Sequence, residues 1–242
     1  MKRQNIRKAL LLLSFLIFPV TFNFFSPYLI IAGAGEGIIS GSFIFFMLLF
    51  ACSLLWGRAF CGWLCPGAGV QEFCFAVNER KVANGWANWI KYFIWVPWIL
   101  CIIVAAASAG GLERINPFYM TETGITIDSP EQYLIYFIVL AVFVALSFLI
   151  GKRAGCHYIC WMAPFMVIGS KARRIGKWPS LHLEANQSKC SHCLKCERTC
   201  PMSLAVNSMV SNEKMEHDEC ILCGSCVDNC PQGVIKYTYP FV

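Results

Sequence analysis

Charged residues and histidines are scarce in this chain of 242 residues, and several common cofactor motifs are missing. Only 14% of the residues are Asp, Glu, Lys or Arg, and there are four histidines. No G-x-G-x-x-G motif and no Walker phosphate loop occurs, so no nucleotide site is indicated. There is no C-x2-C-H motif for haem c, and only His157 lies near an apolar segment that could face a haem b. We therefore expect neither haem nor nucleotide.

Long stretches without any charge occupy much of the first 150 residues. They run over Ala9–Ile31, Ile38–Trp56, Tyr92–Gly110 and Gln132–Gly151. An apolar helix of about 20 residues crosses a hydrocarbon core of about 30 Å, so we predict four transmembrane helices. The first could instead be a secretory signal peptide, but such an apolar region has only about 7–15 residues. We expect an uncleaved span that is kinked or interrupted near Pro19.

The placement of lysine and arginine predicts the orientation in the membrane. The N-terminus and the segments 57–91 and 152–177 are basic, whereas the loops 33–37 and 111–131 are not. Because loops rich in Lys and Arg stay cytoplasmic, we predict a multi-pass protein of the cytoplasmic membrane with both termini inside. The net charge of +6 is concentrated beside apolar segments, so we expect the lipid bilayer, and no nucleic acid, as a partner.

Two cysteine runs near the C-terminus carry the strongest signal. Each reads C-x2-C-x2-C-x3-C-P, from Cys190 to Pro201 and from Cys220 to Pro231. In bacterial ferredoxins with this spacing, three cysteines of one run bind a [4Fe-4S] cluster and the fourth binds the other cluster. A zinc ribbon uses two cysteine pairs instead, and disulfides are rare in a reducing compartment. The predicted ligands are Cys190, Cys193, Cys196 and Cys230 for cluster 1, and Cys220, Cys223, Cys226 and Cys200 for cluster 2.

A second cysteine pattern follows two of the predicted spans. Glycine and a basic residue precede a C-x3-C motif at Cys61 and Cys65, and again at Cys156 and Cys160. A spacing of four puts both thiols on one face if the segment is helical. We predict that these four cysteines converge on a further metal centre, most simply an iron–sulfur cluster, with inert buried thiols as the alternative. The remaining cysteines have no partner at ligand spacing and are assigned to packing: Cys52, Cys74 and Cys101.

The stretch GRAFCGWLCPGAGVQEF, residues 57–73, resembles the signature of the membrane-bound ferredoxin-type proteins of the NapH/MauN class. It is also similar to the membrane part of the NosR-like maturation proteins. The resemblance covers essentially the whole chain, and it departs from the family at Trp161, where a proline is expected after Cys160. It implies four spans, two C-x3-C motifs and a terminal ferredoxin module. It further implies electron transfer between the quinone pool, or a membrane partner, and a redox enzyme complex.

The predicted fold class is an all-α four-span transmembrane domain, residues 1–177, followed by a small α+β two-cluster (2[4Fe-4S]) ferredoxin-like domain, residues 178–242. We expect no catalytic residue, and an electron-transfer subunit of an oxidoreductase complex rather than a self-contained enzyme. Expected partners are redox proteins of a membrane complex and quinone or quinol. Two alternatives stay open: a quinone reductase with its own site, and a maturation factor that supplies electrons for cofactor insertion into a partner reductase.

Overall fold

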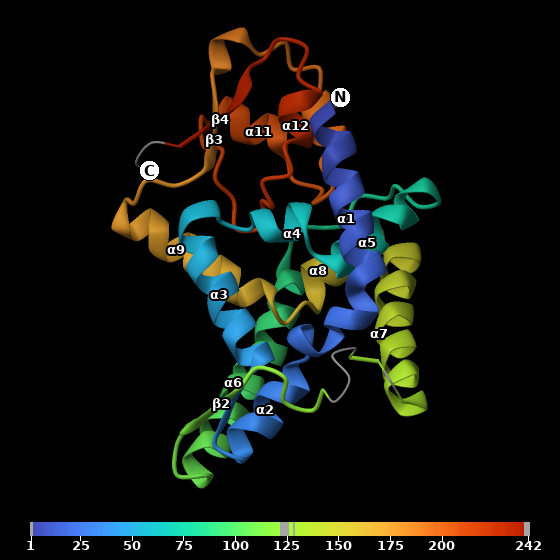
Figure 1. Cartoon of the computed structure of the whole chain (residues 1–242). Coiled ribbons are helices and arrows are strands. Elements are labelled where there is room, and N and C mark those ends of the chain that lie inside the picture. The colour runs from blue at the N-terminus through green and yellow to red at the C-terminus, as the bar shows by residue number, and fades with distance from the viewer. Residues whose placement is uncertain (1, 122–125, 128, 240–242) are drawn as a thin grey trace.

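The computed structural model describes residues 2–121, 126–127 and 129–239. Figure 1 shows an elongated helical body, with the C-terminal segments stacked on one end beside the N-terminus. Two residues that contribute to the acidic character of the predicted 111–131 loop, Glu122 and Asp128, lie outside the described residues.

The N-terminal apolar stretch forms two helices joined by a 3-10 turn. Helix α1 spans Lys2–Thr21, η1 spans Phe22–Phe25 and α2 spans Pro27–Gly35. Helix α1 ends two residues after its internal Pro19, as expected for a residue that removes a helix hydrogen bond. Helix α2 restarts at Ser26, whose hydroxyl accepts a bond from the Leu29 amide, with Pro27 at the first helical position.

The middle of the chain contains two similar successions of one long and two shorter helices. The first is α3 (Gly41–Trp56), α4 (Ala59–Trp63) and α5 (Pro66–Phe73); the second is α7 (Pro130–Leu149), α8 (Ala154–Tyr158) and α9 (Ala163–Gly176). Between them lie η2 (Cys74–Ala76), η3 (Trp86–Trp89) and α6 (Ile90–Ser108). Two short parallel strands, β1 (Ile38–Ser40) and β2 (Arg114–Asn116), pair at the far end of the helical body.

Three described helical stretches are long and apolar enough to cross a membrane: Lys2–Gly35, Trp86–Ser108 and Pro130–Leu149. At most 17% of the most apolar window in each is buried inside the chain, so most of their apolar side chains face outward. The remaining predicted span, α3, is apolar but has 16 residues. Its rise of about 24 Å falls short of a hydrocarbon core of about 30 Å. The structure therefore gives three candidate spans where the sequence predicted four.

The C-terminal segments form a small α+β unit of ferredoxin type. Strands β3 (His182–Ala185) and β4 (Ile235–Thr238) pair antiparallel, with His182 opposite Thr238. Between them lie four short helices: η4 (Gln187–Lys189), α10 (Lys195–Arg198), α11 (Val206–Ser211) and α12 (Ser225–Asp228). The buried residues of this unit, Met202 and Ile221 among them, belong to one continuous core with Phe46 and Met166 of the helical body. The two parts are therefore packed together directly.

Candidate metal centres

The cysteines predicted for cluster 1 surround one small cavity at the outer end of the molecule. Cys190, Cys193, Cys196 and Cys230 all line it. Burial raises the pKa of Cys196, and the charges of the other three thiols add to this effect. Cys193 is exposed and the other three are half-buried. The structure thus brings these four thiols together near the surface, and their ligation of iron stays a prediction.

The cysteines predicted for cluster 2 line a second cavity, which is more deeply enclosed. Cys200 from the first run joins Cys220, Cys223 and Cys226 from the second. Burial first, and neighbouring thiol charges second, raise the pKa of Cys200 to about 12. Burial likewise raises the pKa of Cys220 to about 11. Three of these side chains are buried and Cys220 is half-buried, so this quartet faces inward.

Equivalent residues of the two cysteine loops share an uncommon backbone conformation. His192 and Leu194 have φ of 51° and 58°, and the residues at the same two places in the second loop, Leu222 and Gly224, have 48° and 74°. Positive φ is rare outside glycine and persists where the surrounding structure enforces it, often at functional sites. The matching conformations indicate that both loops curl around their thiols in the same way.

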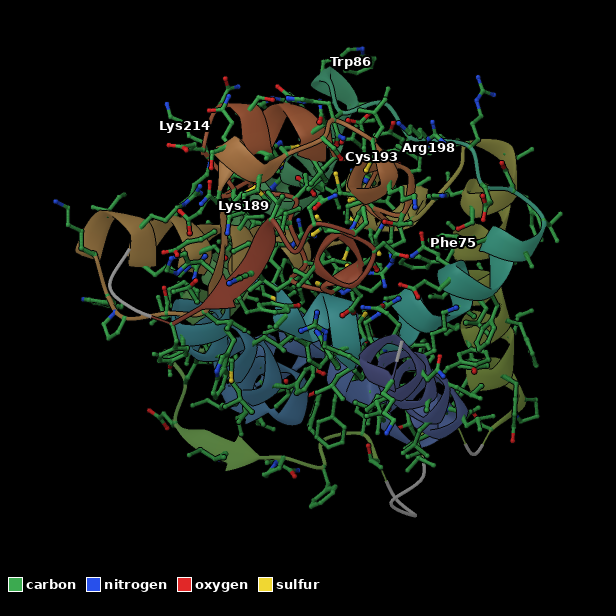
Figure 2. All side chains as sticks on the ribbon, turned by 90° about the horizontal axis from the view of Figure 1, so that it is seen from above. Phe75, Trp86, Lys189, Cys193, Arg198 and Lys214 are labelled. Carbon is green, nitrogen blue, oxygen red and sulfur yellow. The ribbon has the colours of Figure 1, made fainter. Side chains whose placement is uncertain are left out.

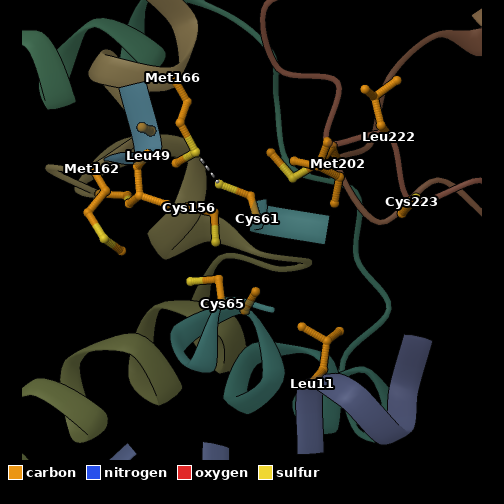
Figure 3. Close-up of a cluster of buried hydrophobic side chains, with 14 of the residues drawn as sticks. Leu11, Leu49, Cys61, Cys65, Cys156, Met162, Met166, Met202, Leu222 and Cys223 are labelled. Atoms are coloured by element: carbon orange, nitrogen blue, oxygen red, sulfur yellow. Dashed lines mark hydrogen bonds between the residues drawn. The ribbon is translucent and has the colours of Figure 1, made fainter. Parts of the chain in front are cut away.

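The four cysteines of the C-x3-C motifs also converge, at the junction between the helical body and the ferredoxin unit. All four are only 4–6% exposed. Burial first, and the charges of Cys61, Cys156 and Cys160 second, raise the pKa of Cys65, as expected where four thiols are neighbours. Figure 3 shows Cys61, Cys65 and Cys156 pointing into one space. We call this group the tetrad.

In each of the two motifs, a short helix ends between the two cysteines. Helices α4 and α8 each end between the two thiols, so the pair does not share one helix face as the spacing of four suggested. The next helix starts directly after Cys65, at Pro66, but only at Ala163 in the second motif. The two extra residues include Trp161, whose indole N–H donates to the Phe25 carbonyl at 3.2 Å. With Trp161 in place of the proline expected from the family, the turn between Cys160 and the next helix is longer, and Cys160 still belongs to the tetrad.

Burial makes these thiols costly to ionise. It raises the pKa of Cys65 and Cys156, and it raises that of Cys160 to about 12. Thiolates at such a site need compensating positive charge, which a bound metal centre supplies. The chain contributes a hydrogen bond as well, because the Gln71 amide donates to the Cys156 sulfur at 3.1 Å. The donor set and its surroundings therefore fit a metal centre with thiolate ligands.

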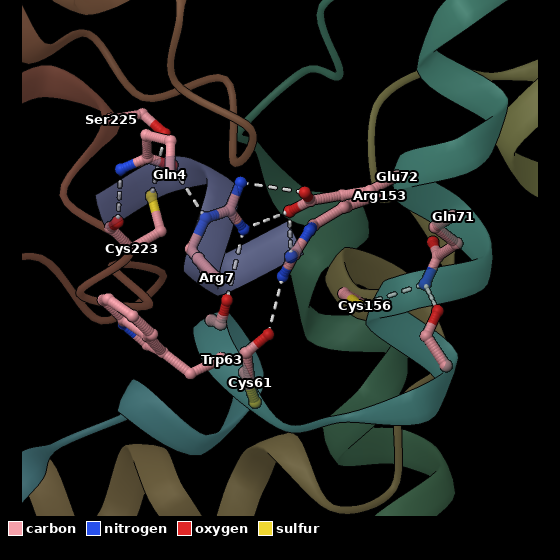
Figure 4. Close-up of polar contacts among 12 residues, drawn as sticks. Gln4, Arg7, Cys61, Trp63, Gln71, Glu72, Arg153, Cys156, Cys223 and Ser225 are labelled. Carbon is pink, nitrogen blue, oxygen red and sulfur yellow. Dashed lines mark hydrogen bonds and ion pairs between the residues drawn. The ribbon is translucent and has the colours of Figure 1, made fainter. Parts of the chain in front are cut away.

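A buried ion cluster clamps the first motif from one side (Figure 4). Arg7 donates two hydrogen bonds to the Glu72 carboxylate, at 2.6 and 2.8 Å, and Arg153 pairs with the same carboxylate. The guanidinium of Arg153 also donates to the Cys61 carbonyl at 2.8 Å, and that of Arg7 to the Gly62 carbonyl at 3.2 Å. Burial alone would raise the pKa of Glu72, but the two arginines outweigh it and lower the pKa. Glu72 is therefore an ionised structural anchor.

A second ion cluster joins the first motif to the ferredoxin unit. Glu219, directly before Cys220, pairs with Arg58 at 2.7 Å and with Lys91. Burial would raise the pKa of Glu219, but these two cations lower it to about 2. The charges of Cys61 and Cys160 act on Arg58 in turn and help to raise the pKa of its guanidinium. Together with Arg153, this guanidinium places permanent positive charge beside the tetrad.

The helix that carries Cys61 touches the loop that carries Cys223. The indole N–H of Trp63 donates to the Leu222 carbonyl at 3.0 Å. At Gly62 a Cβ would overlap the carbonyl oxygen of Ile221, so only glycine permits this approach. In Figure 3 Met202 lies between Cys61 and Cys223. The tetrad and the inner quartet are thus neighbours across a close-packed contact.

Several residues at these centres were not singled out by sequence analysis. Gln71 and Gly62 lie within the family-like stretch 57–73 but carry no ligand chemistry, so only their positions reveal their roles. Lys91 was counted only among the basic residues of the segment 57–91, whereas its ammonium is fully buried. Among the described residues no three His, Cys, Asp or Glu side chains converge on a single ion position. A cubane places each thiolate on a separate iron and does not require that convergence.

Comparison with known families finds iron–sulfur domains over both cysteine-bearing parts of the chain. The family described as "4Fe-4S dicluster domain" matches residues 182–235, which contain both ferredoxin runs. The family described as "4Fe-4S binding domain" matches residues 41–83 and 133–179, which contain the two C-x3-C motifs. The chain therefore carries ferredoxin-type 4Fe-4S domains together with apolar helices of membrane-spanning length.

Comparison with curated proteins identifies individual relatives of the chain. It is 29% identical to the regulatory protein NosR of Pseudomonas aeruginosa over 80% of this chain and 27% of NosR. It is 25% identical to the ferredoxin-type protein NapH of Haemophilus influenzae over 78% of this chain and 65% of NapH. An uncharacterized protein of Methanocaldococcus jannaschii is 26% identical over 75% of this chain and 65% of its own length. The chain thus spans less than two thirds of each of these relatives.

NapH ferredoxin-type proteins and NosR are homologues of this chain, which confirms the resemblance at residues 57–73. No solved structure matches it.

Proposed function

We propose that the chain is a membrane-bound electron-transfer subunit that passes electrons between the quinone pool, or a membrane partner, and a redox enzyme complex. The observation that carries this proposal is the direct contact of the two cysteine-bearing parts, Gly62 against Ile221. Clusters bound to the thiols would supply reversible one-electron chemistry. The polypeptide supplies the ligands, the buried counter-charges and the exclusion of water between the sites.

The proposed architecture follows from the same contacts. A membrane domain, residues 1–177, uses α3 as a fourth, shorter span, and a cytoplasmic ferredoxin domain, residues 178–242, covers its inner end. Cluster 1 is held by Cys190, Cys193, Cys196 and Cys230; cluster 2 by Cys220, Cys223, Cys226 and Cys200; and a third centre by Cys61, Cys65, Cys156 and Cys160. The buried cations beside the tetrad support the third centre, since they offset the charge of four thiolates.

An apolar cavity beside the tetrad supports exchange with a hydrophobic electron carrier. It has a volume of about 300 Å³, and its walls are almost entirely apolar. Phe18 and Phe22 line it from the N-terminal helices, and Leu140 and Phe143 line it from α7. Three of the four tetrad cysteines also border it: Cys65, Cys156 and Cys160. Apolar, aromatic walls of this kind suit a quinone ring and the start of its isoprenoid tail.

Metal content tests the third centre. We expect the purified chain to contain iron and acid-labile sulfide for three centres, and each single Cys→Ala change in the tetrad to remove the same one. The reason is that a shared site needs all four thiolates at once. Cys74→Ala is the matched control, because Cys74 is buried but donates its thiol to the Val70 carbonyl at 3.4 Å. Iron for two centres only, unchanged in all four variants, would contradict this part of the proposal.

Filling the cavity tests the quinone exchange separately. Leu140→Trp should slow reduction of the chain by a short-tailed quinol at least tenfold while leaving its iron content intact. Leu134→Trp on the same helix is the control, because Leu134 is 63% exposed on the outward face. Equal quinol rates in both variants and the wild type would exclude this cavity as the entry point.

The maturation role left open by the sequence is the second candidate, since the relatives include a protein named regulatory protein NosR as well as ferredoxin-type proteins. The two roles differ in one observable. An electron-transfer subunit is needed for every turnover of its mature partner complex, whereas a maturation factor is needed only while that partner is assembled. Turnover of a purified, mature partner with and without the chain therefore distinguishes them.

A further inference from the structure

Most acidic side chains of the ferredoxin unit form ion pairs with cations of the helical body. Glu184 and Glu213 are exposed, and the other acids of this unit pair with cations that precede residue 178 in the chain. The pairs are Glu197 with Lys81, Glu216 with Arg173, Asp218 with Lys171 and Arg174, Glu219 with Arg58 and Lys91, and Asp228 with Arg3. Negative charge thus gathers at the junction with the helical body.

The opposite side of the unit is basic. Lys189, Lys195, Arg198 and Lys214 are exposed, and none of them forms an ion pair within the described part of the chain. Figure 2, which looks down on this end of the molecule, shows Arg198 on one side of Cys193 and Lys189 and Lys214 on the other. We call these four basic residues the outer basic face.

The same side carries the outer thiol quartet. Cys193 is exposed, and the cavity that it lines is bordered by Leu194, an apolar side chain that is 39% exposed. The inner quartet is instead enclosed and lies against the helix of Cys61. An external protein can therefore approach cluster 1 from the side of the outer basic face.

We propose that the outer basic face docks a soluble redox protein whose surface is acidic around its own redox centre. The proposal rests on the proposed function, because it needs cluster 1 to be the exit toward a soluble partner. Opposite charges steer diffusional encounter and fix the orientation of the two surfaces, and this attraction accelerates association by about 10 to 1,000-fold. Leu194 supplies a small exposed apolar contact beside the outer thiol cavity.

The test compares two probes with the full-length chain in detergent. The acidic probe is a flavodoxin and the basic probe is mitochondrial cytochrome c. We expect the double variant K189E/K195E to lower the second-order rate of electron exchange with flavodoxin about tenfold at low ionic strength. The difference should vanish near 1 M salt, where the Debye length is about 3 Å. R114E/K177E makes the same charge change at exposed residues away from this face and should leave the rate unchanged.

A second readout does not depend on electron transfer. Zero-length carbodiimide joins lysine amines to carboxylates in contact, so flavodoxin should cross-link to Lys189 or Lys195, and cytochrome c should not. Equal rates in both double variants, or cross-links only at Lys177, would overturn the docking proposal. Reduction of the chain by dithionite, followed by paramagnetic resonance, reports the clusters directly. A chain with reducible clusters but no charge-dependent exchange refutes the docking face alone, whereas a chain without reducible clusters refutes the proposed function.

Discussion

Removing the carboxylate of Glu72 should strongly destabilise the chain. Glu72→Gln keeps the shape of the side chain but leaves Arg7 and Arg153 facing each other without a counter-ion. The side chain of Arg153 is 0% exposed and that of Arg7 is 4% exposed, so water cannot replace the lost charge. Breaking a buried ion pair on one side costs about 3–5 kcal/mol.

That magnitude is large against the total stability of a folded protein, which is about 5–15 kcal/mol. For a chain of this size each kcal/mol shifts the melting temperature by roughly 2–4 °C, so the expected loss is roughly 10 °C. Tryptophan fluorescence during heating in detergent measures it, and iron release on the same ramp reports the tetrad. Glu79→Gln is the matched control, because Glu79 is exposed on the following segment.

Two outcomes would refute the reasoning about Glu72. A melting temperature for Glu72→Gln within 1 °C of the Glu79→Gln control would show that the ion cluster contributes nothing to stability. A second refuting result would be that Glu72→Gln and Glu72→Ala melt at the same temperature and that neither releases iron early. This would show that the ion cluster does not hold the helix of Cys61 in place. Partial recovery in Glu72→Asp, which keeps the charge on a shorter side chain, is the expected third result.

Three further predictions concern the contacts around the thiols. Cys200→Ala should remove the cluster of the second cysteine run, and paramagnetic resonance showing loss of only the other cluster would reject the crossed ligation. Gly62→Ala should destabilise the junction by about 1–3 kcal/mol, since its Cβ must displace the Ile221 carbonyl. Easier proteolytic release of the ferredoxin unit measures this effect, and a cleavage rate equal to that of Gly35→Ala, where a Cβ meets open space, would contradict it. Gln71→Leu should lower the midpoint potential of the third centre, because it removes the N–H donor to the Cys156 sulfur. A redox titration with the potential unchanged would show that this bond does not act on the centre.

The sequence was informative where chemistry dictates spacing. The two ferredoxin runs, the repeated C-x3-C motif and the apolar segments are set by ligand geometry and bilayer thickness, and all of them are legible without a structure. The length of α3 could not be predicted from the sequence. The apolar run that contains α3 begins at Ile38–Ser40, and these residues form a strand with β2 instead. A hydropathy pattern cannot distinguish those two uses of apolar residues.

The buried ions escaped prediction for a different reason. Lys91 begins an apolar segment and Glu219 lies in a polar one, so each matches a solvated residue at an element boundary. Lys91 and Glu219 are 128 residues apart in the chain, and only the packing of the ferredoxin unit onto the helical body brings them together. Long-range pairs of this kind leave no local pattern in a single sequence. The same holds for the closeness of Gly62 to Ile221, which depends on the packing of two parts of the chain.

The tetrad draws its thiols from two helix successions, with Cys65 in the first and Cys156 in the second. A centre held by both would close a loop of about 90 residues, and cross-linking a loop of that size in the unfolded chain is worth about 4–5 kcal/mol in the entropic treatment of disulfides. The metal would therefore act as a reversible cross-link between the two halves of the membrane domain. It could load only after the second half is in place. Retained iron would then report correct insertion of the whole chain, and chelation would loosen the two halves without breaking a covalent bond.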